Sequence, residues 1–114
     1  MKQKKEIESI ARQTRDQIAM LFPGEKIDMI LYGSYARGEA REDSDIDLLF
    51  LVDSTREAIA EKNWQVGEIA ADLFMDHEVM VSPIVENRDY YRERISLLPF
   101  FRNIDREGVR LSVG

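Results

Sequence analysis

Cysteine is missing from this 114-residue sequence, and histidine occurs only once. Without cysteine, the chain can form neither a disulfide framework nor a thiolate metal site. No apolar run reaches the roughly 18 residues that a membrane-spanning helix needs. The N-terminal segment "MKQKKEIESIARQ" also has charged residues where a secretory signal would be apolar. We therefore expect a cytoplasmic protein with no membrane partner.

Basic residues are also in short supply, with 16 Lys and Arg against 22 Asp and Glu and a net charge of −6. Proteins that bind nucleic acids usually carry a basic surplus, because they must neutralise phosphates. The composition therefore argues against nucleic acid as the main partner. A domain this acidic needs divalent cations or a local positive group if it is to handle phosphates.

Apolar residues, by contrast, are plentiful at 44%, which is enough for a hydrophobic core. The length and the lack of repeats or linkers predict a single domain over residues 1–114. Helical spacing and strand-like runs alternate along the chain. They predict helices over 3–22, 34–38, 55–75 and from 87 onward, strands over 27–32, 46–52 and 78–85, and a short helix and last strand in the tail. This order predicts an α/β (α+β) two-layer sandwich, a small mixed sheet with helices packed on it.

Two aspartates stand at the start of the second strand, in "SDIDLLFLV". Side chains alternate along a strand, so Asp45 and Asp47 point to the same face and lie close together. Two such carboxylates repel each other unless a cation lies between them. Mg²⁺ prefers oxygen ligands of this kind and usually keeps waters and substrate phosphates as well. The spacing therefore predicts a site for one or two Mg²⁺ ions, the alternative being a solvated acidic turn.

A Gly-Ser turn ends the first strand, ten residues before the aspartates. Gly33 permits a sharp turn and a close approach by a ligand. Ser34 is expected to cap the short helix, whose first N–H groups also suit an anion. Arg37 can add positive charge there, or instead form an ion pair with Glu39 or Glu42. Together the turn and the aspartates fit a nucleoside triphosphate, with nucleotidyl transfer as the reaction and pyrophosphate leaving.

The segment "GSYARGEAREDSDID" resembles the signature of the DNA polymerase β-like nucleotidyltransferase superfamily, which is Gly-Ser, ten residues, then Asp-x-Asp. The small size and the wording, including Arg37, Gly38 and Ser44, are similar to its minimal nucleotidyltransferase branch. The resemblance implies the fold of that superfamily, with ATP and Mg²⁺ bound. It assigns the metal and catalysis to Asp45 and Asp47. It assigns nucleotide binding to Gly33, Ser34, Arg37 and Ser44.

The family pattern also has a third carboxylate on a later strand, where it serves as base or completes the metal site. In this sequence the corresponding strand is "HEVMVSPIV", and Glu78 is its best acidic candidate. Counting back from the end of the strand instead places Ser82 or Pro83 at the family position, and neither is a carboxylate. Metal binding is thus expected, whereas turnover depends on whether Glu78 acts or is only a solvated residue at the strand start.

Members of the minimal branch often pair with a small helical protein of the HEPN class (higher eukaryotes and prokaryotes nucleotide-binding). The resemblance implies an antitoxin that moves AMP from ATP to a tyrosine of such a partner. Two alternatives remain open at the level of sequence. One is a binding module for nucleotide or partner without catalysis, and the other is adenylation of a small molecule such as an antibiotic.

Overall fold

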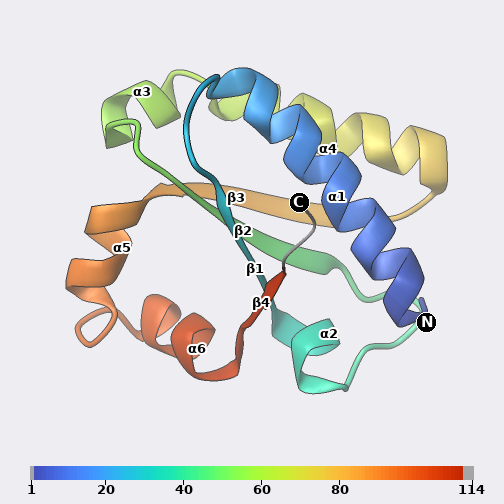
Figure 1. Ribbon diagram of the computed structural model, residues 1–114. Coiled ribbons are helices and arrows are strands. Elements are labelled where there is room, and N and C mark those ends of the chain that lie inside the picture. The colour runs from blue at the N-terminus through green and yellow to red at the C-terminus, as the bar shows by residue number, and fades with distance from the viewer. Residues whose placement is uncertain (1, 112–114) are drawn as a thin grey trace.

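The computed structural model describes residues 2–111, and its centre is strand β2 (Ile46–Val52) (Figure 1). Strand β2 pairs with β1 (Asp28–Tyr32) in antiparallel fashion and with β3 (Val81–Asn87) in parallel fashion. Strand β4 (Val109–Leu111) pairs with the free side of β1, which gives the order β3-β2-β1-β4. The helices are α1 (Lys4–Leu21), α2 (Gly33–Arg37), α3 (Arg56–Ala60), α4 (Asn63–His77), α5 (Arg88–Arg94) and α6 (Pro99–Glu107).

Helices cover both faces of this sheet: α1 and α4 lie on one side, and α5 and α6 lie on the other (Figure 1). The alternation of β2 divides its buried side chains between the two layers. Residues of β2 that face α1 and α4 are Ile46, Leu48, Phe50 and Val52. Leu49 and Leu51 face α5 and α6, and Asp47 continues that row toward the start of the strand.

The predicted sandwich, a small mixed sheet with helices packed on it, is therefore confirmed. The expected central strand is confirmed as well, because every residue of β2 except Asp47 is buried. Pro83 lies in the edge strand β3, where its missing N–H is tolerated. Within residues 2–111, no helix combines the length and apolar content that a membrane crossing requires.

Element boundaries differ from the sequence prediction in the long helix and at both ends of the third strand, which runs to Asn87 rather than to residue 85. The helix expected over 55–75 is divided into α3 and α4, with a break at Glu61 and Lys62. Apolar spacing does not detect this break, because Ile59 and Val66 face the same core on either side of it. The third strand starts at Val81 rather than residue 78, because α4 continues to His77 and Glu78 ends it in the left-handed conformation, with φ of 53°.

A buried arginine joins the loops at the opposite end of the sheet from Asp47. The Nε of Arg88 donates to Asp28 Oδ2 at 2.8 Å, and its Nη2 donates to the carbonyls of Lys26 and Leu51 at 2.9 and 3.0 Å. Arg88 also pairs with Asp53. Burial alone would raise the pKa of Asp28, but the bond to Arg88 and its charge outweigh burial and lower it. This network anchors α5 to β1 and β2.

Candidate active site

An open cleft of about 600 Å³ lies where β1 ends and β2 begins. Its walls come from three parts of the chain: the β1–α2 turn, the segment leading into β2, and one face of α6. The lining residues are Tyr32, Gly33, Ser34, Arg37, Asp43, Ser44, Asp45, Asp47, Phe100, Asn103, Ile104 and Glu107. The Gly-Ser turn and the two aspartates, ten residues apart in sequence, thus share one cavity.

Gly33 is the residue that lets the turn and the aspartates come together. Its φ is +74°, a region that disfavours side chains. A Cβ built on Gly33 would overlap Asp47 Oδ2 and lie 3.1 Å from Asp47 Cγ. Tyr32, which precedes Gly33, is the direct cross-strand partner of Asp47. Glycine is therefore needed here both for backbone conformation and for space beside the carboxylate.

The two aspartates occupy one face at the start of β2, as the alternation predicts. Burial is the main reason that the pKa of Asp47 is raised, and the charge of Asp45 adds to it, whereas Arg37 lowers it. Burial, together with the charge of Asp47, also raises the pKa of Tyr32 to about 12. A bound cation would reduce the repulsion between the carboxylates of Asp45 and Asp47, so the pair fits a hard divalent ion.

The remaining predicted nucleotide residues line the same cleft; the expected cap by Ser34 is wrong, whereas the expected ion pair of Arg37 with Glu39 is present. Ser34 does not cap α2: Tyr32 holds the cap position without a side-chain bond, and Ser34 lies in the first turn. Arg37 pairs with Glu107 of α6 at 3.1 Å and with Glu39 at 3.5 Å. Ser44 Oγ accepts a hydrogen bond of 2.7 Å from the backbone N–H of Arg41, which fixes the turn before Asp45.

Glu78 is not brought into this cleft. It is exposed at the end of α4 and lines a separate depression. Within residues 2–111, no three acidic or histidine side chains are grouped closely enough to hold a metal. The residue beside the aspartates on the neighbouring strand is Ser82, which pairs with Asp47 in register and donates its hydroxyl to Asp45 Oδ2 at 3.4 Å. Strand β3 ends at Asn87 rather than at residue 85, so the count from the strand end does not hold; the register shows instead that the neighbour of Asp47 on β3 carries a hydroxyl, not a carboxylate.

Known proteins resemble this chain in sequence and in fold. Residues 11–104 match the model of the nucleotidyltransferase domain family. The chain belongs to this family. Two relatives from Methanocaldococcus jannaschii, each named "Putative protein adenylyltransferase" (MJ0141 and MJ0604), are 32% identical over 80 residues. Those alignments cover 70% of this chain and 79% and 72% of the relatives.

Solved structures of toxin–antitoxin proteins share the fold of this nucleotidyltransferase. A toxin–antitoxin crystal structure with AMP-PNP aligns with a TM-score of 0.55 at 23% identity, covering 93% of this chain and 72% of that one. The toxin–antitoxin MntA-HpeT mutant aligns with a TM-score of 0.53 at 21% identity and the same coverage. At these identities the likeness establishes the fold.

Helix α6 is the wall of the nucleotidyltransferase cleft that the sequence did not reveal. Its four lining residues are spaced three or four apart, so they form one helical face: Phe100, Asn103, Ile104 and Glu107. That spacing is visible in the sequence, but it gives no sign of which part of the chain the face meets. Only the fold places the face opposite Asp45 and Asp47.

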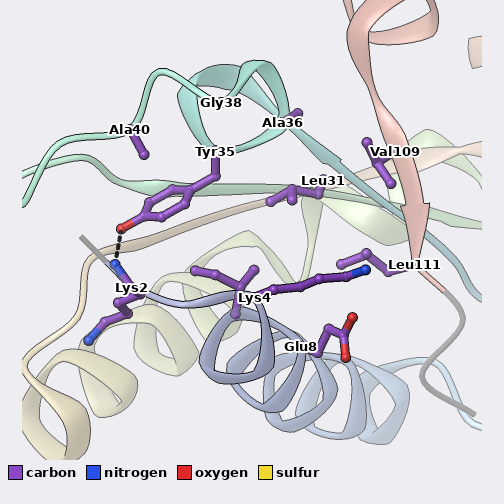
Figure 2. A pocket seen from close by; sticks show the side chains of 11 residues that line it. Lys2, Lys4, Glu8, Leu31, Tyr35, Ala36, Gly38, Ala40, Val109 and Leu111 are labelled. Carbon is purple, nitrogen blue, oxygen red and sulfur yellow. Dashed lines mark hydrogen bonds between the residues drawn. The ribbon is translucent and has the colours of Figure 1, made fainter.

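A second cavity, of about 410 Å³, lies on the other side of α2 (Figure 2). It is enclosed by the start of α1, by α2 and by β4. Figure 2 shows Tyr35 of α2 reaching toward Lys2, whose backbone N–H donates to the Tyr35 hydroxyl at 3.3 Å. Helix α2 thus presents Ser34 and Arg37 to the nucleotidyltransferase cleft and Tyr35 and Ala36 to this cavity.

Proposed function

We propose that this nucleotidyltransferase moves AMP from ATP to a protein hydroxyl, specifically to a tyrosine of a small helical partner of the HEPN class, as an antitoxin. One observation carries the proposal: Gly33 is packed against Asp47 so closely that only glycine fits, in a cleft that also holds Ser34 and Arg37. That arrangement puts an anion-binding turn beside a pair of carboxylates. ATP as the substrate also agrees with the cytoplasmic location expected from the lack of cysteine.

Different residues of the cleft contact different parts of the nucleotide in this proposal. Backbone N–H groups at the Gly33 turn and the Ser34 hydroxyl donate to phosphate oxygens. Ser44 fixes the turn that leads to Asp45 by accepting the hydrogen bond from the Arg41 N–H. Arg37 is the single cationic side chain among the described lining residues, so it neutralises phosphate charge. The acceptor oxygen bonds to the α-phosphorus while the bond from that phosphorus to the bridging oxygen breaks, and pyrophosphate leaves.

Asp45 and Asp47 are the residues that would hold Mg²⁺. Mg²⁺ is typically bound by one or two carboxylates together with substrate phosphates, which matches a pair of aspartates that no third acid or histidine within residues 2–111 joins closely enough to complete a metal cluster. Bound there, the ion would neutralise phosphate charge and lower the pKa of the attacking hydroxyl. Burial and the charge of Asp45 raise the pKa of Asp47, and a bound cation would stabilise its charged form.

The comparisons support a protein as acceptor. The archaeal relatives are named protein adenylyltransferases, and the structural neighbours are toxin–antitoxin proteins, one of them with an ATP analogue. The other neighbour carries two aspartate-to-glutamate changes two positions apart, the same spacing as Asp45 and Asp47.

The direct test is to incubate the chain with labelled ATP, Mg²⁺ and the protein encoded by the adjacent reading frame. We expect label on a tyrosine of that protein, and no label when Asp45→Asn and Asp47→Asn are combined. The matched control is Asp72→Asn with Asp76→Asn, two exposed aspartates of α4 outside the cleft. Failure to label the partner at any Mg²⁺ concentration would refute the proposed transfer.

Ser82 favours a second candidate function, a nucleotide-binding or partner-binding module without turnover. A hydroxyl occupies the strand position next to the aspartates where a third acid would be expected. If this reading is correct, the double aspartate variant still binds and neutralises the partner normally. Ser82→Asp then serves as a probe: a gain in labelling would show that the missing carboxylate limits catalysis.

A further inference from the structure

Phe100 is an aromatic side chain that is not part of the hydrophobic core. It lines the cleft at the first turn of α6, yet 46% of it is exposed. Its neighbour Phe101 is buried and, together with Ile104 of the same helix, packs α6 against Tyr91 of α5. The core therefore uses Phe101, and Phe100 is left facing the cavity.

The ring of Phe100 is nevertheless held in a defined orientation. Its centroid lies 5.7 Å from that of Tyr32 in an edge-to-face arrangement of 84°. It also lies 6.1 Å from the Phe101 ring at 42°. Tyr32 is itself buried and directly precedes Gly33. The exposed ring is thus fixed, through Tyr32, next to the turn that binds phosphates in the proposed function.

We propose that Phe100 is the stacking platform for the base of the nucleoside triphosphate, and this inference rests on the proposed function. A nucleotide whose phosphates lie on the Gly33 turn must place its base elsewhere in the same cleft. The described lining of the cleft is otherwise made of small, charged and aliphatic side chains and the amide of Asn103, apart from the buried Tyr32. Every nucleobase is flat and can stack on an aromatic ring. The exposed side of the Phe100 ring offers a surface for such stacking.

The arrangement also explains why α6 runs along the cleft. Phe100 and Glu107 lie seven residues apart, which corresponds to roughly 10 Å of helix. Glu107 contacts Arg37 at the phosphate end, whereas Phe100 contacts Tyr32. One helix therefore carries a contact for the base at its start and a contact to the phosphate-binding arginine at its end.

The test measures binding of two ligands, ATP and inorganic tripolyphosphate, to the full chain with Mg²⁺ by calorimetry. Phe100→Ala should raise the Kd for ATP at least about fivefold, because base stacking on an aromatic ring contributes about 1–3 kcal/mol. The Kd for tripolyphosphate, which has no base, should stay the same. Phe100→Trp should retain ATP affinity, because it keeps an aromatic face.

Phe74→Ala is the matched control, because Phe74 is also 46% exposed but lies on α4 outside the cleft. Thermal melts of both variants check that each still folds. Equal ATP affinity in Phe100→Ala and wild type would overturn the inference, and so would an equal loss for both ligands. A variant that binds ATP normally but labels the partner poorly would also overturn it, since Phe100 would then contact the acceptor.

Failure of the inference is distinguishable from failure of the proposed function. If wild type binds ATP and loses that binding in the double aspartate variant, the site stands and only Phe100 is in question. If wild type binds neither ATP nor tripolyphosphate, both the proposed function and the role of Phe100 are refuted.

Discussion

Gly33→Ala tests the feature on which the site depends most directly. The added methyl group would overlap the Asp47 carboxylate, whose Cγ lies only 3.1 Å from the Cβ position. Asp47 belongs to the central strand and its backbone is fixed by pairing with Tyr32 and Ser82. The carboxylate must therefore rotate away from the turn, because the backbone cannot move.

Two separable costs follow from this substitution. Alanine in the left-handed conformation costs about 1–2 kcal/mol of stability, since φ of Gly33 is +74°. For a domain of this size that corresponds to a fall in Tm of roughly 4–8 °C. Displacing a carboxylate that orients a metal site typically costs about 10- to 100-fold in metal affinity or activity. We expect both costs in Gly33→Ala.

Gly24→Ala isolates the first cost from the second. Gly24 has φ of +78°, nearly the same as Gly33, but a Cβ there meets no atom within 4 Å. Both variants should therefore lose stability in thermal melts, and only Gly33→Ala should lose ATP-dependent labelling at saturating Mg²⁺. If labelling by the two variants is equal, the closeness of Gly33 to Asp47 is irrelevant to function and the reasoning fails.

Three further predictions concern single side chains. Burial and the charge of Asp45 raise the pKa of Asp47, so the folded chain binds the proton of this carboxyl more tightly than the unfolded chain does. The contribution of Asp47 to stability therefore falls as the pH rises from the ordinary pKa near 3.8 through the raised value. Asp47→Asn should therefore raise Tm at pH 7 without Mg²⁺ and lose this advantage at pH 3; a difference that does not change with pH would contradict the sign. Arg88→Met should cost about 3–5 kcal/mol in urea unfolding, because it leaves Asp28 charged and largely buried with only the longer 3.5 Å pair to the exposed Arg110, and a loss below about 1 kcal/mol would refute that. Glu78→Gln should leave labelling within about twofold of wild type, as expected for an exposed residue outside the cleft, whereas a tenfold loss would restore its catalytic assignment.

Sequence patterns that involve only neighbouring residues predicted much of the fold and half of the cleft. Alternation in β2 fixed the shared face of Asp45 and Asp47, and turn chemistry fixed the need for Gly33. Two helix starts were also readable, although the cap expected at Ser34 was not formed: Thr55 accepts from the Ala58 N–H at 3.1 Å, and Asn87 accepts from the Tyr90 N–H at 2.9 Å. Each of these depends on neighbours within a few residues.

Features that depend on distant parts of the chain were not readable. Glu78 was placed in a strand because "EVMV" has strand-like residues, but α4 continues to His77, whose ring forms a hydrogen bond of 2.8 Å with the Gln13 side chain of α1. Phe100 and Glu107 belong to a helix that meets the Gly-Ser turn across some 70 residues of chain. No local pattern specifies these long-range placements.

The pair between Arg37 and Glu107 makes nucleotide affinity a difference between two competing contacts. Any phosphate that takes up the Arg37 guanidinium replaces a carboxylate already bonded to it at 3.1 Å. If the cleft binds ATP as proposed, its affinity for ATP is what remains after that exchange. The same exchange would free Glu107, so the end of α6 would change its bonding on filling of the cleft.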